Sequence, residues 1–154
     1  MHLKLNLSYS VLLTGKKLKK KLNFCLSGQK LKLIDKVKYL GVTLDEHLSW
    51  KTHIKQILLK LSRANGLLAK VRHYVSKETL NNIYYALFHS HLQYAAIVWG
   101  QGKSQLATKI QTLQNKALRI IHFKSPRESA NPLFCDSKIL KFDDIVKAQS
   151  CVLA

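Results

Sequence analysis

The residues most suited to metal-dependent chemistry are two adjacent carboxylates, Asp143 and Asp144, which follow Phe142. Such a pair can hold two Mg²⁺ ions for phosphoryl transfer, and it is then expected at a hairpin tip between two apolar strands. Here the pair opens a helical pattern, so the start of a helix, where carboxylates meet free N–H groups, is the favoured interpretation. The other close pair, Asp45 and Glu46, follows a predicted strand. We therefore assign no catalytic residue and no metal ligand.

The histidines and cysteines do not form a recognisable ligand or nucleophile set. His89 and His91 are two residues apart and would point to different sides of a helix. Cys25, Cys135 and Cys151 lie far apart in the sequence, which disfavours a zinc ribbon or a disulfide framework. No glycine-rich phosphate loop and no HExxH motif occurs, so we expect no cofactor in this chain.

Net charge is the property that most restricts the choice of partner. The 154 residues include 26 Lys and Arg but only 8 Asp and Glu, which gives a formal net charge of +18. A field of this size selects polyanionic partners, nucleic acid first and anionic membrane surfaces second. No carboxylate occurs between Glu46 and Glu78 or between Glu78 and Glu128. Helices in these stretches lack the ion pairs that support ordinary exposed helices, which favours a partner that supplies the negative charge.

Hydrophobic periodicity predicts three main helices in the later part of the chain. Apolar residues recur at steps of three and four over 48–71, from Ser76 to about 98, and over about 104–122. Gly66 is a candidate end or bend of the first helix, Ser76 is predicted to cap the second, and a last helix is predicted to begin near Asp143. The candidate nucleic-acid-binding cations are Lys19, Lys20, Lys51, Lys55, Lys60, Arg63, Lys70, Arg72, Lys116 and Arg119.

The first 45 residues show the alternation and the β-branched and aromatic content of strands. Residues 22–26 and 31–34 flank a glycine-containing turn at 27–30 and predict a hairpin. Residues 37–44 predict the strongest strand, in which Gly41 indicates a bulge or a close backbone approach. Five lysines within residues 16–21 form either a solvated loop or a loop that contacts phosphates.

These patterns predict an α+β fold in which a short β-hairpin and strand portion precedes a predominantly α-helical bundle. We expect a β portion over 1–45, a helical bundle over 46–125 and a C-terminal helical tail over 126–154. The longest unbroken apolar stretch, 94–99, is far shorter than the roughly 18 residues of a membrane span. The N-terminus shows no signal-peptide pattern, so we expect an intracellular location, in nucleus or cytoplasm, and no membrane partner.

A series of motifs occurs in a fixed order along the chain. Leu92, Tyr94, Trp99 and Gly100 form an L-x-Y-x-x-x-x-W-G pattern, and segment 113–121 forms an L-Q-x-x-A-x-R-x-I pattern. The other motif segments are 37–45, 48–54, 80–87, 132–134, 139–140 and 144–145. Together these segments resemble the C-terminal part of reverse transcriptases (RNA-directed DNA polymerases) of non-LTR retrotransposons of the jockey and CR1-like kind. Each motif is weak by itself, but the ordered set spans nearly the whole chain.

The resemblance implies a palm-end and thumb fragment of such a polymerase. Tyr39, Leu40 and Gly41 would then lie at the end of the palm, near the grip on the primer strand. The helices would be thumb-like and would pack on an RNA–DNA hybrid or RNA, with phosphates near the cations named above. The implied partners are nucleic acid and the upstream palm and fingers portion, and Mg²⁺ is expected only in the full-length protein.

The chain departs from the family pattern near its N-terminus. The Asp-Asp hairpin that carries the metal ions in the family would lie upstream of Met1. Tyr9 stands where the family tends to have a lysine that is thought to protonate the leaving pyrophosphate. We therefore expect the chain to be inactive alone. Two alternatives stay open: a non-enzymatic basic nucleic-acid-binding module, and a protein whose basic helices bind a membrane surface or a partner helix.

Overall fold

The structure, a computed structural model, describes residues 9–10, 25–26, 29–30, 32–100 and 105–153. The chain divides into two compact units, Met1–His53 and Ile54–Ala154. The alternating leucines before residue 9 and the lysine-rich segment with Lys19 and Lys20 lie outside the described residues. A two-stranded antiparallel hairpin followed by mostly helical segments confirms the predicted α+β fold class.

Short strand pairs form the described part of the first unit. Strands β1 (Tyr9–Ser10) and β4 (Lys32–Leu33) pair in parallel, and β2 (Cys25–Leu26) pairs antiparallel with β3 (Gln29–Lys30). The hairpin predicted in this region is therefore present as β2–β3. Its second strand, however, begins inside the stretch 27–30 that was predicted to be the turn.

Strands β5 (Lys36–Tyr39) and β6 (Val42–Asp45) form the third pair, an antiparallel hairpin in which Tyr39 lies opposite Val42. The prediction of one strand over 37–44 with a bulge at Gly41 is therefore wrong. Leu40 and Gly41 have φ of 44° and 80°, the two positive values that a type I′ connection requires. Leucine seldom occupies such a position, and its apolar character made the reversal look like continued strand.

Helix α1 (Lys51–Val71) is the longest element, with 21 residues. Its buried stripe contains Ile54, Ile57, Leu61, Ala64 and Leu68, whose spacing of three and four residues explains why the helix forms where periodicity predicted it. The helix continues past Gly66, which therefore does not end it. The connection from β6 uses left-handed backbone at Leu48 and Trp50, with φ of 49° and 58°, so the helix begins three residues later than predicted.

The second predicted helix, from Ser76 to about residue 98, is interrupted. Ser76 caps it as predicted, because its hydroxyl accepts the Thr79 N–H at 3.2 Å. The chain then leaves helical geometry at Tyr94 and Ala95, where Ala95 has a φ of 52°. The segments in order are α2 (Lys77–Tyr84), the π-helical turn η1 (Tyr85–His89), α3 (Ser90–Gln93) and α4 (Ala96–Trp99).

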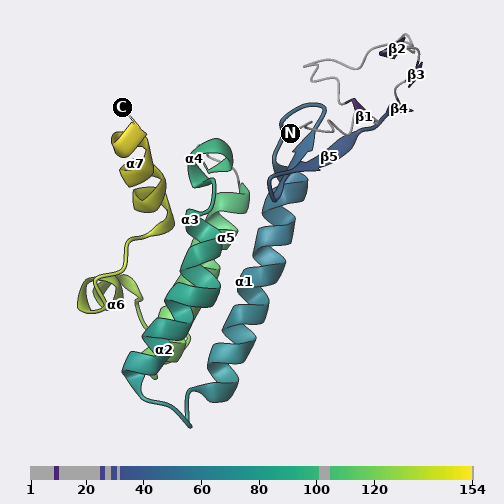
Figure 1. The fold of residues 1–154 in the computed structure, drawn as a ribbon. Coiled ribbons are helices and arrows are strands. Elements are labelled where there is room, and N and C mark those ends of the chain that lie inside the picture. The colour runs from purple at the N-terminus through teal and green to yellow at the C-terminus, as the bar shows by residue number, and fades with distance from the viewer. Residues whose placement is uncertain (1–8, 11–24, 27–28, 31, 101–104, 154) are drawn as a thin grey trace, which may run out of the picture. The chain divides into compact units, whose positions relative to one another are not determined.

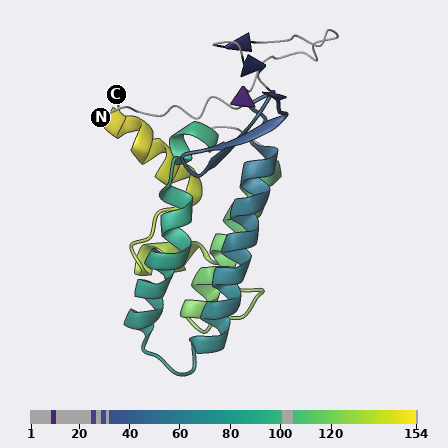
Figure 2. The same ribbon diagram turned by 45° about the vertical axis from the view of Figure 1, so that its right-hand side comes forward.

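Three more helices complete the second unit. Helices α5 (Gln105–Ile121) and α7 (Phe142–Leu153) confirm the predictions for these regions. Helix α6 (Asn131–Asp136) was not predicted; it is one and a half turns long, too short for periodicity to reveal, and Pro132 stands in its first turn, where proline is tolerated. In Figures 1 and 2 the loop after α1 reverses the chain, so that α2 and α3 run back beside α1.

The core of the second unit lies between α2, η1, α3, α5 and α7. Tyr84 and Phe88 are fully buried and stack with ring centroids 5.1 Å apart. Trp99 of α4 stacks on Phe142, with ring centroids 5.5 Å apart. The next residue, Gly100, allows α7 to approach closely, because a Cβ there would lie 2.7 Å from a Val146 methyl carbon. Helix α7 thus packs against the segment that follows the break at Ala95.

Candidate nucleic-acid interface

Five cations on α1 point away from its buried stripe. Their side chains are exposed, whereas the apolar residues on the other side of the helix are buried. None of the ion pairs found among the described residues includes a cation of α1, and α1 itself contains no carboxylate with which its cations could pair. We call these residues the basic face of α1: Lys51, Lys55, Lys60, Arg63 and Lys70.

The packing of α1 within the second unit fixes which side of the helix stays exposed. Asn65 is buried, and its Nδ2 donates a hydrogen bond of 2.9 Å to the carbonyl oxygen of Leu113 in α5. Lys60 lies close enough to His91 of α3 to act on it: burial lowers the pKa of His91, and the Lys60 charge lowers it further. The cations of α1 lie at exposed positions outside this packed side of the helix.

The candidate cations outside α1 have different surroundings. Lys116 of α5 is exposed. Arg119 is half-buried, and its Nε donates to the carbonyl oxygen of Glu128 at 2.8 Å. The guanidinium carbon of Arg72 lies 4.8 Å from the ring centroid of Phe123. Arg72 thus lies just after α1 and Arg119 in the last turn of α5, and both have intramolecular contacts.

The residues predicted near the primer grip form the tip of the β5–β6 hairpin. Tyr39 is 64% exposed and Leu40 is 71% exposed. The left-handed backbone at Leu40 is strained for a residue with a branched side chain. Backbone strain of this kind clusters at ligand-binding and switch regions.

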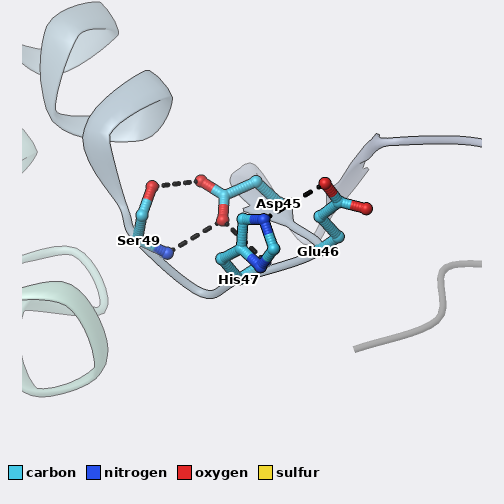
Figure 3. Close-up of polar contacts among 4 residues, drawn as sticks. All are labelled: Asp45, Glu46, His47 and Ser49. Carbon is cyan, nitrogen blue, oxygen red and sulfur yellow. Dashed lines mark hydrogen bonds and ion pairs between the residues drawn. The ribbon is translucent and has the colours of Figure 1, made fainter. Parts of the chain in front are cut away.

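Asp45 joins β6 to the connection that leads into α1 (Figure 3). Its Oδ1 accepts the Ser49 N–H at 2.8 Å and the His47 N–H at 3.1 Å, and its Oδ2 accepts the Ser49 hydroxyl at 2.7 Å. Burial alone would raise the pKa of this carboxyl, but the hydrogen bonds from Ser49 and His47 outweigh it and lower the pKa below the ordinary 3.8. Asp45 therefore acts as a structural anchor of this connection.

The neighbours of Asp45 support the same conclusion. Glu46 points toward His47, with an Oε1–Nε2 distance of 3.3 Å. His53, in the first turn of α1, is buried, and its Nδ1 accepts the Thr43 N–H at 3.4 Å. The Asp45–Ser49 and Thr43–His53 contacts thus tie β6 to the connection and to the start of α1. The neighbouring carboxylates have different partners: Asp45 bonds to Ser49, and Glu46 lies against the His47 ring.

Asp143 and Asp144 occupy the first turn of α7, which confirms the prediction that they open a helix. The side chains that accept the first N–H of α7 belong to α5. The Phe142 N–H donates to Gln114 Oε1 at 3.0 Å and to Gln111 Oε1 at 3.3 Å. In the described part of the chain, no group of three or more His, Cys, Asp or Glu side chains lies close enough together to hold a metal ion.

No helix formed by the described residues is both long enough and apolar enough to cross a bilayer.

Sequence analysis named Arg72 as a candidate cation but missed the two rings beside it, those of His73 and Phe123. Arg72 and His73 follow α1, Phe123 follows α5, and the ring centroids of His73 and Phe123 lie 5.7 Å apart. The available signal for Phe123 was its position in the sequence. It lies just past the apolar stripe of the third predicted helix and directly before Lys124. Its contact with Arg72 depends on the packing of α1 and α5 and is not visible in either segment alone.

Comparison with known proteins points to polymerases of mobile elements. The chain is 30% identical over 126 residues to the RNA-directed DNA polymerase from mobile element jockey of Drosophila funebris. The match covers 79% of this chain but only 14% of that protein, so the chain spans about one seventh of its relative. No family model and no solved structure matches the chain. The similarity supports a relationship to reverse transcriptases.

Proposed function

We propose that the chain is the palm-end and thumb fragment of a retrotransposon RNA-directed DNA polymerase and that it grips the template–primer duplex without being catalytic alone. The similarity to the jockey polymerase supports the origin of the fragment. The observation that carries the binding role is the basic face of α1, five exposed cations on one helix without an ion pair among the described residues.

The chemistry of this face suits a phosphate backbone. Lysine and arginine neutralise phosphates and release counterions, which supplies most of the affinity of sequence-independent binding. A cation paired with a carboxylate of the protein would have to break that ion pair before it could bind a phosphate. The cations of α1 have no such pair among the described residues. An RNA–DNA hybrid, whose grooves are recognised by shape and phosphate position, is the duplex that a reverse transcriptase holds.

The test is hybrid binding by the whole chain at several salt concentrations. The double variant Lys55→Gln/Arg63→Gln removes two cations from the basic face of α1. The matched control Lys138→Gln/Lys147→Gln removes the same charge from exposed positions after α6 and in α7. The slope of log affinity against log salt should become shallower by roughly 1.4 to 1.8 in the test variant, since each phosphate contact contributes about 0.7 to 0.9.

The control double variant should keep the slope of the original chain. Equal losses in both double variants would show that charge in general, rather than the basic face of α1, determines binding. Absence of hybrid binding at low salt would contradict the proposal altogether.

The β5–β6 tip has its own part in the proposal, as the contact with the primer strand. Leu40→Asn is the informative substitution, because asparagine suits the left-handed turn position but removes the apolar side chain. The variant should keep its hairpin and bind the hybrid less tightly. Unchanged affinity with an intact hairpin would remove the tip from the interface.

Lack of catalysis is tested separately. The chain, supplied with Mg²⁺, a primed template and deoxynucleotides, should incorporate none. Incorporation that disappears in the Asp143→Ala/Asp144→Ala double variant would overturn both the proposed inactivity and the structural assignment of this pair.

A further inference from the structure

Two loops meet at one end of the helical unit and form a group that we call the aromatic–basic cluster: Arg72, His73, Tyr74 and Phe123. The first three residues follow α1, and Phe123 follows α5. The guanidinium of Arg72 lies over the Phe123 ring at 4.8 Å, and the His73 ring meets the same ring edge-on at 5.7 Å. Contacts of both kinds are individually favourable, so the two loops hold each other in place.

Phe123 has a backbone conformation that is unfavourable for a residue with a large side chain. Helix α5 ends with a Schellman motif: the Phe123 N–H bonds to the Ile120 oxygen at 3.3 Å and the Lys124 N–H bonds to the Arg119 oxygen at 2.9 Å. The motif puts Phe123 in the left-handed region, with a φ of 55°. Glycine is the usual residue at this position, and a bulky aromatic residue there is strained.

Core packing does not compensate for this strain, because the ring is 51% exposed. Tyr74, in the neighbouring loop, is 86% exposed. A strained backbone that holds an exposed aromatic ring is a reason to look for a ligand. The strained backbone is at Phe123 alone, but both rings are exposed to solvent.

The charges around the cluster favour an anionic ligand. Residues 70–79 and 119–128 contain six Lys or Arg and two Glu. One of the carboxylates, Glu128, is engaged with Lys124 at 3.1 Å and with the Ser125 N–H at 2.9 Å. Lys77 and Lys124 also lie near His122, whose pKa is lowered by burial first and then by these two charges, while Asp136 acts in the opposite direction. The loop segments that carry the two rings are therefore rich in cations, and one of them, Arg72, lies directly over Phe123.

We propose that the aromatic–basic cluster binds single-stranded nucleic acid, with unpaired bases stacked on Phe123 and Tyr74 and phosphates held by the surrounding cations. Exposed rings among cations are the recurring solution for binding unpaired strands, because every base has a face that stacks. Bases inside a duplex are already stacked on each other and gain nothing from such rings. The inference rests on and extends the proposed nucleic-acid-binding function, but the two rings that carry it, Phe123 and Tyr74, are not part of the basic face of α1.

The test uses Phe123→Gly in the whole chain, because glycine fits the left-handed position and the variant should fold at least as well as the original. The probe is a single-stranded RNA about a dozen nucleotides long, within the range of site sizes of known binders. Its affinity should fall roughly ten-fold or more in Phe123→Gly, and a second variant, Tyr74→Ala, should weaken binding in the same direction.

Two controls separate stacking from charge and from backbone effects. Lys138→Gly makes the same backbone change at the end of α6, where Lys138 also has a left-handed φ of 53°, and it should leave single-strand binding within about two-fold. An oligomer of the same length made of abasic sites keeps the phosphates, so its weaker affinity should be the same for the original chain and for Phe123→Gly.

The outcomes also separate this inference from the proposed function. Phe123→Gly should keep its affinity for a fully paired RNA–DNA hybrid. Unchanged single-strand affinity in Phe123→Gly, or equal affinity of the original chain for the abasic oligomer and the RNA, would overturn the inference. Single-strand binding that depends on Phe123, in a chain that does not bind hybrid, would support the inference and contradict the proposed duplex grip.

Discussion

The Nε2 of Gln114 donates a hydrogen bond of 3.0 Å to the phenolic oxygen of Tyr84, and both side chains are completely buried. The same Nε2 donates to the Leu140 oxygen at 2.8 Å, and Oε1 accepts the Phe142 N–H at 3.0 Å. One amide thus joins α2, α5 and the start of α7. A buried polar group is stabilising only when its partners are present, so this site should be sensitive to substitution.

Replacing Gln114 with leucine keeps the volume but removes the donor to the buried Tyr84 hydroxyl, the donor to the part-buried Leu140 oxygen and one of the two acceptors of the Phe142 N–H. We expect the free energy of unfolding to fall by about 3 kcal/mol, since each orphaned group costs roughly 1 to 3 kcal/mol and neighbours relax. Urea denaturation followed by circular dichroism measures the change. Gln111→Leu is the matched control, because its longer bond to Phe142 is only partly buried, and it should lose less than about 1 kcal/mol. Equal losses would show that Gln114 has no special place in the core.

Tyr84 should make the stability fall in alkaline solution. Burial raises the pKa of its hydroxyl far above the ordinary 10, although the bond from Gln114 opposes this effect. Above about pH 10 the unfolded chain loses this proton while the folded chain keeps it, so the free energy of unfolding declines as the pH rises. Tyr84→Phe should lose part of this decline, and Tyr74→Phe, at an exposed position, should retain it. The measurement is urea denaturation between about pH 8 and about pH 11.

Two glycine-to-alanine substitutions should change stability in opposite directions. At Gly66, within α1, an added Cβ meets nothing within 4 Å, so Gly66→Ala should stabilise the chain by about 0.5 to 1 kcal/mol. At Gly100, the added Cβ would lie 2.5 Å from the Ala96 oxygen and 2.7 Å from a Val146 methyl carbon. Gly100→Ala should therefore destabilise by about 1 to 3 kcal/mol. Thermal unfolding of the two variants side by side tests this, and a shift of the same sign in both would refute it.

Asp45 should contribute to stability in a way that acid removes. Its pKa is lowered in the folded chain, so the contribution is present above the ordinary value of 3.8 and is lost as the pH falls through the folded value. Asp45→Asn should destabilise the connection into α1 by about 1 to 3 kcal/mol at neutral pH and flatten the acid dependence. Amide hydrogen exchange at Ser49 and His47 reports the effect locally. Asp35→Asn, at an exposed position, should leave the exchange of both amides unchanged.

Periodicity predicted the long helices because their stability comes from apolar stripes that are visible in the sequence. It located α1, α5 and α7, but the reversal at Leu40 and the break at Ala95 were missed. Both involve a non-glycine residue with positive φ, and at the reversal the neighbouring Gly41 was interpreted as a bulge or close backbone approach rather than as part of a turn. At such positions the surrounding packing determines the conformation, and only the folded chain contains that information.

The candidate interface was predictable to a similar degree. The absence of carboxylates indicated that α1 would present cations without partners, and the exposed positions of five of them agree with its amphipathic pattern. The surroundings of Arg72 were not predictable, because its neighbour Phe123 is about 50 residues away in the sequence. The buried role of Gln114 was hidden for the same reason: its three bonds join segments that only tertiary packing brings together.

The break at Tyr94 and Ala95 gives the second unit a built-in optical reporter. By redirecting the chain it places Trp99, which is 2% exposed, against Phe142, with its indole N–H bonded to the Tyr94 oxygen at 3.0 Å. The chain's other tryptophan, Trp50, is half-exposed in the connection before α1. One indole is buried and the other is partly exposed to water, so their fluorescence emission should differ. The emission spectrum can therefore distinguish detachment of the C-terminal helix from melting of the hairpin connection without any added label.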